Sequence, residues 1–485
     1  MGALVAALSK RGGDSVPLVM IMLQELIHRG SQSHEVITPD AAISARSFEE
    51  LRKHTSASSN VAIGHNASSR EKEFLRLRDL RAVFEGRVFH ESASSYLTRI
   101  KTIERQSPVE IAKGLLRGFD GAYTFTFASA GRIIVGRDPL GTKPLYYGEN
   151  EEAYAVASER KALWKIGIHN TRPFPPGNLA IMNQRGFSFK PIWTIKLRPP
   201  KKIRMSAAVM RLRILLEEST QERLRDVQNV GIAFSGGLDS SLVARLAQES
   251  GAKLHLISTS MAGRPGLSHA TEAAKALGLP IVVQEYSISD VENTLPKVLW
   301  LIEEPDVMKA GVAIPLFWSA QLASKLSCTV LLAGQGADEM FGGYRRYLTV
   351  YEKKGVEGVA ESLFRDTVMC HEVNFQRDEP LCAYHDIELR LPFIDTKLAR
   401  FALSLPIDLK IESADDPLRK RILRQLAKGL GIPAFITERP KKAIQFETGV
   451  DKTLRDLAKS KGLTSREYVE EVYKTVRLRS ECDLS

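Results

Sequence analysis

The fold is decided by the stretch Ser235-Gly236-Gly237-Leu238-Asp239-Ser240-Ser241, which joins an apolar run to an amphipathic segment. Residues 230–234 predict a strand, and residues 240–249, closed by Gly251, predict a helix. Two adjacent glycines let the backbone turn tightly, and the amides at the start of the helix then point toward one spot. The pattern therefore predicts a strand–loop–helix nest that holds phosphate oxygens.

Asp239 lies in this loop, at a position where an anion is expected to bind. A carboxylate there is favourable when a divalent cation lies between it and the phosphates. Ser235, Ser240 and Ser241 add hydroxyl donors, whereas the lysine of the GxxxxGKS/T phosphate loop is absent. The structural alternative is an ordinary Gly-Gly turn that caps a helix.

Strands and helices alternate around this loop. Residues 205–225 predict a long amphipathic helix, residues 253–259 and 280–284 predict strands, and residues 270–277 predict a helix. Such alternation is typical of a doubly wound parallel sheet. Beyond about residue 345 the sequence is mainly helical.

The first part of the chain has another pattern. Short runs rich in aromatic and β-branched residues indicate strands joined by tight turns, so we expect an α+β fold with a largely antiparallel sheet. The expected strands are residues 121–128, 132–136, 145–148 and 153–157, and the expected helices are residues 16–28 and 108–117. The basic, proline-containing stretch 196–204 predicts a linker between domains at residues 1–195 and 205–485.

Composition excludes several classes of function. The net charge of +11 comes from scattered basic residues without interleaved aromatics, so we expect no nucleic-acid partner. Cys328, Cys370, Cys382 and Cys482 are widely spaced, which indicates free thiols in a reducing compartment. No apolar run has the length of a membrane-spanning helix, and the N-terminus lacks the order of a signal peptide. We therefore expect a cytoplasmic protein with no membrane partner.

Three further motifs follow the loop. Residues 331–344 read Leu-Leu-Ala-Gly-Gln-Gly-Ala-Asp-Glu-Met-Phe-Gly-Gly-Tyr, residues 388–395 read Glu-Leu-Arg-Leu-Pro-Phe-Ile-Asp, and residues 439–449 read Arg-Pro-Lys-Lys-Ala-Ile-Gln-Phe-Glu-Thr-Gly. Together with the SGGxDS loop, the signature of ATP pyrophosphatases, they make this part of the chain resemble the synthetase half of class B asparagine synthetases and their relatives, the β-lactam synthetases. The resemblance implies an α/β ATP-pyrophosphatase (adenine nucleotide α-hydrolase-like) domain with a parallel sheet and a helical C-terminal part.

The resemblance also implies substrates and site residues. ATP is split at the α-phosphate, Asp239 and Asp338 bind Mg²⁺, and Lys441 faces the α-phosphate, with Lys442 as the neighbouring candidate. A metal and a lysine suit this chemistry, because in-line displacement at phosphorus spreads negative charge over the phosphoryl oxygens. The expected contacts to ATP and pyrophosphate are Ala233, Ser235, Gly236, Gly237, Leu238, Asp239, Ser240, Ser241, Thr259, Ala333 and Gly334.

Gln335 departs from the resemblance. Many glutamine-dependent members have glutamate in this Gly-x-Gly turn, so the glutamine removes a negative charge beside the expected acyl-adenylate. Arg390 and Asp395 are expected either to close a structural salt bridge or to contact the substrate.

The first half is similar to the family's glutaminase domain, which implies an N-terminal-nucleophile-hydrolase fold. The matching pieces are His28-Arg29-Gly30 and residues 136–148, 157–163 and 174–177. That mechanism needs a cysteine at position 2, but the residue is Gly2, and no cysteine precedes Cys328. The glutamine-binding motifs are also altered, at Glu85-Gly86-Arg87, Glu91-Ser92-Ala93-Ser94 and His65-Asn66. We therefore expect this half not to hydrolyse glutamine.

The leading interpretation is an asparagine synthetase-like, AMP-forming amide ligase. ATP and aspartate would form β-aspartyl-AMP and pyrophosphate, and ammonia, free or supplied by a partner, would then give asparagine. One alternative is a synthetase of the β-lactam synthetase or peptide-cyclase type that uses another amine. Others are a non-catalytic regulatory homologue and a tRNA-modifying enzyme, which would use a catalytic cysteine. The sequence leaves open whether the protein forms a homodimer and whether a partner supplies ammonia.

Overall fold

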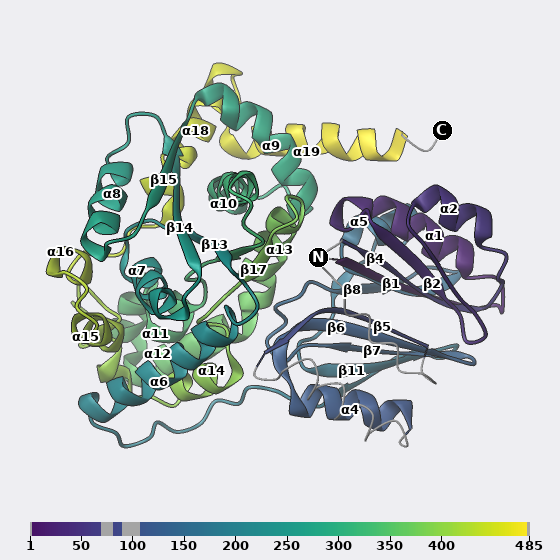
Figure 1. Ribbon diagram of the computed structural model, residues 1–485, viewed down its shortest axis with the longest axis horizontal. Helices are drawn as coiled ribbons and strands as arrows, with labels where there is room; N and C mark the ends of the chain where they lie inside the picture. The colour runs from purple at the N-terminus through teal and green to yellow at the C-terminus, as the bar shows by residue number, and fades with distance from the viewer. Residues whose placement is uncertain (1, 69–80, 90–106, 483–485) are drawn as a thin grey trace. The chain divides into compact units, whose positions relative to one another are not determined.

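The computed structural model describes residues 2–68, 81–89 and 107–482, and the chain divides into two compact units, residues 1–195 (unit 1) and 196–485 (unit 2) (Figure 1). The altered motif Glu91-Ser92-Ala93-Ser94 lies outside the described residues.

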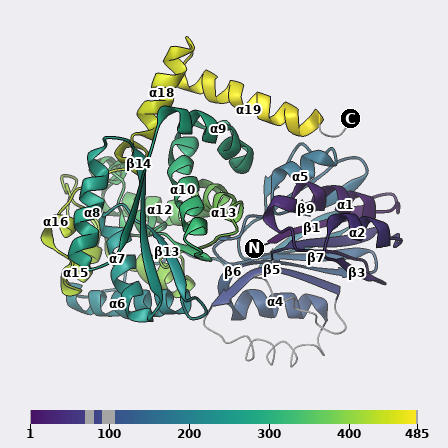
Figure 2. The ribbon, with the colours of Figure 1, turned by 45° about the horizontal axis from the view of Figure 1, so that its top comes forward.

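Unit 1 consists of two antiparallel sheets between helices. The first sheet has the strand order β10-β8-β9-β1-β4-β2-β3, and the second has the order β12-β11-β7-β6-β5. Successive residues of β1 (Gly2–Ser9) alternate between two apolar clusters, one shared with α1 (Val16–Glu25) and one between the sheets. A third cluster packs α4 (Pro108–Gly118) on the second sheet. These helix–sheet–sheet–helix layers are the N-terminal-nucleophile-hydrolase-like fold expected from the sequence (Figure 2).

Of the other elements of unit 1, the sequence predicted β6, β7, β8 and β9, and the rest were not predicted individually. The other elements are β2 (Ser33–Ile37), β3 (Ala42–Ala45), α2 (Phe48–His54), β4 (Val61–Ala67), β5 (Arg81–Phe89), β6 (Asp120–Ser129), β7 (Arg132–Arg137), β8 (Tyr146–Glu149), β9 (Ala153–Ala157), α5 (Arg160–Lys165), β10 (Arg172–Pro173), β11 (Asn178–Asn183) and β12 (Gly186–Pro191).

Arg137 at the end of β7 holds a loop of this unit together from the inside. Its fully buried guanidinium donates to the carbonyl oxygens of Gly141, Lys143 and Phe174, at 2.7, 2.7 and 2.6 Å. A buried carbonyl that loses its donor costs about 1–3 kcal/mol, so this side chain is a structural anchor rather than a surface charge.

We expect Arg137→Met to lower the free energy of unfolding of unit 1 by about 3 kcal/mol or more, because three buried carbonyls lose their donor. Urea unfolding measures the loss. Arg132→Met, a change at the exposed start of the same strand, is the matched control. Equal unfolding free energies for the two variants would contradict the anchoring role.

Unit 2 is built on a parallel sheet with the strand order β15-β14-β13-β16-β17. Helices α7 and α8 cover one face of this sheet and α10 covers the other (Figure 1). From β13 the chain continues to β14 on one side, and it later returns to β16 on the other side of β13. Ligands bind at such a switch point, outside the carboxyl ends of the strands, and the loops after β13 and β16 both lie there.

The elements of unit 2 alternate at first and then become helical, as predicted. They are α6 (Met205–Glu222), β13 (Asn229–Ala233), α7 (Leu238–Ala247), β14 (Lys253–Met261), α8 (Pro265–Leu277), β15 (Ile281–Tyr286), α9 (Ile288–Ile302), α10 (Val307–Lys325), β16 (Val330–Leu332), α11 (Ala337–Phe341), α12 (Arg346–Cys370), α13 (Gln376–Ala383), β17 (Glu388–Arg390), α14 (Thr396–Leu403), α15 (Arg421–Gly429), α16 (Ala434–Thr437), α17 (Ile444–Glu447), α18 (Val450–Ser460) and α19 (Ser465–Cys482).

Several bounds differ from the prediction: α1 ends at Glu25 rather than at residue 28, α6 ends at Glu222 rather than at residue 225, and α8 begins at Pro265 rather than at residue 270. Two further differences, at α7 and β17, have a clear physical reason. Helix α7 begins at Leu238, before the expected start at residue 240, because extended Gly237 acts as its N-cap. Strand β17 interrupts the region expected to be helical, and at three residues it is too short to show a period-2 pattern. Within the described ranges, no helix has both the length and the hydropathy needed to cross a membrane.

Candidate active site

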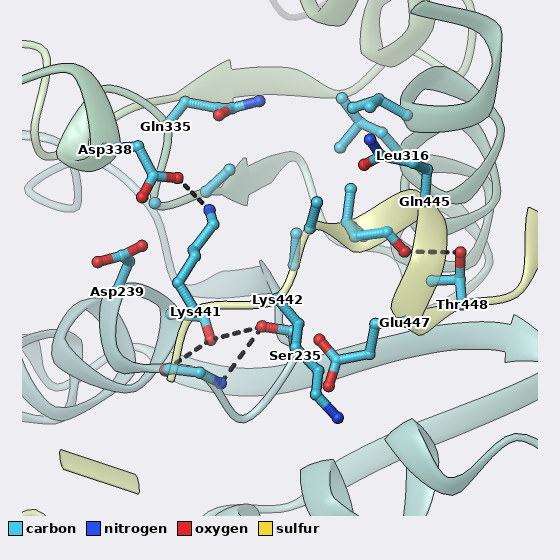
Figure 3. Close-up of a pocket in the computed structure, with 18 of the residues that line it drawn as sticks. Ser235, Asp239, Leu316, Gln335, Asp338, Lys441, Lys442, Gln445, Glu447 and Thr448 are labelled. Carbon is cyan, nitrogen blue, oxygen red and sulfur yellow. Dashed lines mark hydrogen bonds and ion pairs between the residues drawn. The ribbon is translucent and has the colours of Figure 1, made fainter. Parts of the chain in front are cut away.

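The loop after β13 is shaped by its two glycines. Gly236 has a φ of +70°, and a Cβ on it would lie 3.0 Å from the Cα of Ala270 in α8. The amide of Gly237 donates to Ser235 Oγ over 3.3 Å, and Ser240 Oγ donates to the Gly237 carbonyl oxygen over 3.2 Å (Figure 3). Because residues 237–240 line the pocket, the positive end of the α7 dipole faces it, as an anion site requires.

The loop after β16 touches the first loop. A Cβ on Gly334 would lie 2.9 Å from the Cβ of Asp239, so the close approach depends on glycine at this position. Gly336, with a φ of +91°, then turns the chain into α11, which carries Asp338 and Glu339. Figure 3 shows the carboxylates of Asp239 and Asp338 on the same side of the pocket.

Two lysines bind these carboxylates, and we call the four residues the acid–lysine cluster: Asp239, Asp338, Lys420 and Lys441. Lys420 Nζ lies 2.6 Å from Asp239 Oδ2 and 2.5 Å from Asp338 Oδ1. Lys441 Nζ donates to Asp338 Oδ2 (Figure 3). The cluster thus joins the two loops at the switch point to segments more than 80 residues further along the chain.

Asp338 and Lys441 keep their charges at neutral pH. Burial would raise the pKa of Asp338, but Lys420 and Lys441 outweigh burial and hold that pKa well below its usual range. Burial likewise lowers the pKa of Lys441, and Asp338 and Asp239 more than restore it. The carboxylate of Asp338 is therefore available as an anionic ligand.

Lys420 is a site residue that sequence reasoning missed. Its side chain is 3% exposed, and both it and Arg419 adopt left-handed backbone angles, with φ of +52° and +54°. Each costs about 1 kcal/mol or more for a non-glycine residue. The carboxylate of Asp416 holds this turn by accepting the amides of Leu418 and Arg419 at 2.9 Å. In sequence, Arg419-Lys420-Arg421 looks like an exposed basic run, so no local signal identifies it.

The residues present fit Mg²⁺. Asp239 Oδ1 is buried and accepts no hydrogen bond from any described residue. Among those residues, no group of three or more His, Cys, Asp or Glu side chains could hold a metal by itself. Mg²⁺ typically takes one or two carboxylates together with substrate phosphate oxygens, which is the donor set that this site can offer.

The acid–lysine cluster forms one side of a pocket of about 370 Å³, and Leu316, Gln445 and Thr448 lie on the other side (Figure 3). Of the expected ATP-site residues, Gly236 and Ser241 do not line it. Gly236 turns the backbone, and Ser241 is buried with its hydroxyl unbonded to any described residue. The expected residues that do line the pocket are Ala233, Ser235, Gly237, Leu238, Asp239, Ser240, Thr259, Ala333, Gly334, Asp338 and Lys441.

Gln335 lies at one end of the pocket, where its amide nitrogen donates to Asp378 Oδ2 over 2.7 Å. Arg377 binds the same carboxylate through two contacts, of 2.6 and 3.0 Å. Gln335 therefore brings no negative charge of its own to this end of the pocket, and the charge of Asp378 is already compensated.

Glu339 is the buried carboxyl group nearest in sequence to the cluster. Its Oε1 accepts from Tyr344 at 2.6 Å and from Asn374 at 2.7 Å, whereas its Oε2 accepts from no described residue. Burial, with the neighbouring charge of Asp338, raises its pKa. The sequence motif predicted no role for Glu339.

Arg390 and Asp395 have structural roles. Arg390 binds Asp226 and Glu388, with contacts of 2.8 and 2.7 Å, and neither it nor Asp395 lines the pocket. Asp395 caps α14 by accepting the amides of Lys397 and Leu398 at 2.9 Å. The expected salt bridge is therefore present for Arg390, but with Asp226 and Glu388 as its partners.

A parallel sheet with an SGGLDSS loop and a Gly-rich acidic loop at its switch point defines an ATP-pyrophosphatase-type domain. Residues 211–357 and 350–483 match the family model described as asparagine synthase, and residues 76–165 match the model described as glutamine amidotransferase domain. The chain therefore belongs to the asparagine synthase family, whose members are carbon–nitrogen ligases.

The named relatives are similar to this chain over different shares of its length. A putative glutamine-hydrolyzing asparagine synthetase of Methanocaldococcus jannaschii is 29% identical over 92% of this chain and 93% of its own. The root asparagine synthetase of Pisum sativum is 28% identical over 68% of this chain, which spans 58% of the pea protein. A solved structure of the allosteric regulatory enzyme of purine biosynthesis is 15% identical, with a TM-score of 0.36 over 58% of this chain and 80% of its own.

Gly343 offers a test of the cluster, because a Cβ there would lie 1.7 Å from Asp338 Oδ1 and 2.3 Å from Lys420 Cε. We expect Gly343→Ala to shift both groups and to lower ATP-dependent pyrophosphate formation by about 100-fold, the loss typical of a 1 Å misplacement. A coupled pyrophosphate assay measures the loss, and circular dichroism checks that the variant is folded.

Gly429→Ala is the matched control, since this glycine has open space around its Cβ direction and no positive φ. Activity of Gly343→Ala equal to that of Gly429→Ala would show that the cluster geometry is not needed for turnover.

Proposed function

We propose that unit 2 activates the β-carboxylate of aspartate with ATP and amidates it to asparagine. The carboxylate would attack the α-phosphate and release pyrophosphate, and ammonia would then attack β-aspartyl-AMP to give asparagine and AMP. The observation that carries this proposal is the acid–lysine cluster beside the SGGLDSS loop. The names of the relatives supply the choice of aspartate.

Each part of the pocket has a role in this proposal. The loop at residues 235–241 and the start of α7 would bind the β- and γ-phosphates, and Ala233, Thr259, Ala333 and Gly334 would lie along the nucleoside. Asp239 and Asp338 would hold Mg²⁺, which neutralises phosphate charge when bound. Lys441 would move from Asp338 to the α-phosphate, and Lys420 would stay between the two carboxylates. A lysine placed in this way stabilises the charge that develops on the phosphoryl oxygens.

We propose that ammonia comes from solution or from a partner rather than from glutamine. Within the printed sequence no cysteine precedes Cys328. In unit 1, the Glu85 carboxylate, which stands in the altered glutamine-binding motif, is already bound to Lys143 at 2.9 Å. Arg29 is likewise engaged by Glu159 at 2.9 Å. These pairs support a unit that keeps the glutaminase fold without its reaction.

A second candidate keeps the adenylation and changes the amine. It is favoured by Gln335, which binds Asp378 and brings no charge to the pocket. A synthetase of the β-lactam synthetase or peptide-cyclase type would use an amine on its own or another organic substrate. A non-catalytic homologue is disfavoured, because a scaffold has no need for four paired charges around a phosphate loop. The buried free thiols Cys328, Cys370 and Cys382 support a reducing, cytoplasmic location for either reaction.

We expect the purified protein with ATP and Mg²⁺ to release pyrophosphate when aspartate and ammonium are supplied. Asp239→Ala, Lys441→Ala and Lys420→Ala should each lower this rate by at least about 1,000-fold, because each removes a charge of the acid–lysine cluster, which would place Mg²⁺ and Lys441 against the phosphates. Lys459→Ala, a change at an exposed lysine outside the pocket, is the control. Absence of release under every aspartate condition would discard aspartate as the substrate, and unchanged rates in the variants would refute the assigned roles.

An assay with glutamine in place of ammonium distinguishes between the possible nitrogen sources. We expect glutamine to support no asparagine formation and no ammonia release, because unit 1 has no thiol nucleophile in the printed sequence. Ammonia release is measured with glutamate dehydrogenase, and ammonium chloride in the same buffer serves as the positive control. Glutamine-dependent release at a rate that matches asparagine formation would overturn this part of the proposal.

A further inference from the structure

A second pocket adjoins the active site on the side of Lys441. It has a volume of about 560 Å³, and Tyr344, Arg439 and Lys441 line both pockets. Its own wall includes Arg264 before α8, Arg345 before α12, and Arg419 beside Lys420. Lys441 therefore belongs both to the acid–lysine cluster and to the wall of this second pocket.

Positive charge is concentrated in this second pocket, which we call the basic side pocket. Six cationic side chains line it, and Glu447 is the one acidic residue among the described lining residues. Glu447 is already bound to Arg439 at 2.7 Å, and Lys441 is bound to Asp338. The six are Arg264, Arg345, Arg419, Arg439, Lys441 and Lys442.

Three of these cations have no acidic partner among the described residues: Arg264, Arg345 and Lys442. Arg419 directs its guanidinium to backbone carbonyls, including that of Gly343 at 3.0 Å. Burial lowers the pKa of Arg419, Asp416 and Asp338 raise it, and the charge of Arg345 lowers it, so Arg345 lies close enough to Arg419 for the two cations to repel each other. Such an arrangement is unfavourable for the protein alone and favourable around a multiply charged anion.

The position of the basic side pocket indicates which kind of anion it would bind. It continues from the phosphate side of the active site, through Lys441, whereas Leu316, Gln445 and Thr448 lie across the active-site pocket from the acid–lysine cluster (Figure 3). The guanidinium of Arg264 lies at its edge against Gly449, where only a residue without a Cβ leaves room for it. Arginine and lysine side chains in this arrangement suit the oxygens of phosphate groups.

We propose that the basic side pocket binds the pyrophosphate product as it leaves the α-phosphate, so that pyrophosphate departs past Lys441. This inference rests on the proposed ATP-dependent reaction. Pyrophosphate held by Arg264, Arg345 and Lys442 is removed from the acyl-adenylate that it would otherwise attack in reverse. Release of pyrophosphate and retention of the adenylate then take place in different parts of the molecule.

The test replaces Arg264 and Arg345 by glutamine, singly and together, and measures the affinity for Mg²⁺-pyrophosphate by calorimetry without ATP. Each single variant should bind pyrophosphate about fivefold more weakly, and the double variant about 25-fold, as expected when each lost charge contact is worth about 1 kcal/mol. Ionic strength is kept constant, because these contacts are partly exposed and screened by salt. Arg365→Gln, an exposed change outside both pockets, is the matched control.

Any of the following results would contradict the inference. Equal pyrophosphate affinity in the double variant and the control would overturn it, and so would an equal loss in the KM for ATP, since the residues would then belong to the ATP subsite. A loss of AMP or ATP binding without a loss of pyrophosphate binding would assign the pocket to a nucleotide. Orthophosphate bound as tightly as pyrophosphate would make it a general anion site.

The binding measurement also separates this inference from the proposed function. If aspartate and ammonium give no pyrophosphate, calorimetry with added pyrophosphate still decides whether the pocket binds it. If turnover occurs and the variants bind pyrophosphate normally, only the exit pocket is refuted.

Discussion

Lys420 holds two carboxylates together that would otherwise repel each other in a largely buried pocket. Asp239 follows β13 and Asp338 follows β16, and the strand order brings both to the switch point of the sheet. Two like charges so close together raise each other's pKa unless a cation lies between them. The left-handed turn at Arg419, the glycines that let the loops touch and the position of Lys441 all serve this one electrostatic requirement.

The sequence was sufficient for those features that depend on local pattern. The apolar run before Ser235, the glycine pair and the following amphipathic segment predicted the phosphate loop, and the alternation of strands and helices predicted the parallel sheet. The predictions failed where three-dimensional packing decides the outcome. Asp226 was not predicted as the partner of Arg390, and Lys420 was not distinguished from its basic neighbours, because both depend on contacts between segments far apart in the chain.

The fold of unit 1 does not depend on the residue at position 2, the position of the nucleophile in the glutaminase domains that this unit resembles. Its layers are held by the alternating residues of β1, from Ala3 to Leu8, which fill two apolar clusters. The side chain at position 2 contributes to neither cluster. Fold similarity to a glutaminase is therefore weak support for glutamine hydrolysis.

The acid–lysine cluster also fixes when the protein can become active during its synthesis. Asp239 and Lys420 are 181 positions apart, and Asp338 and Lys441 are 103 apart. The central strands of the sheet can pair while later helices are still in the ribosome, but the phosphate loop has no counter-charges until Lys420 and then Lys441 emerge. The two lysines of the acid–lysine cluster are therefore synthesised long after the two carboxylates that they bind.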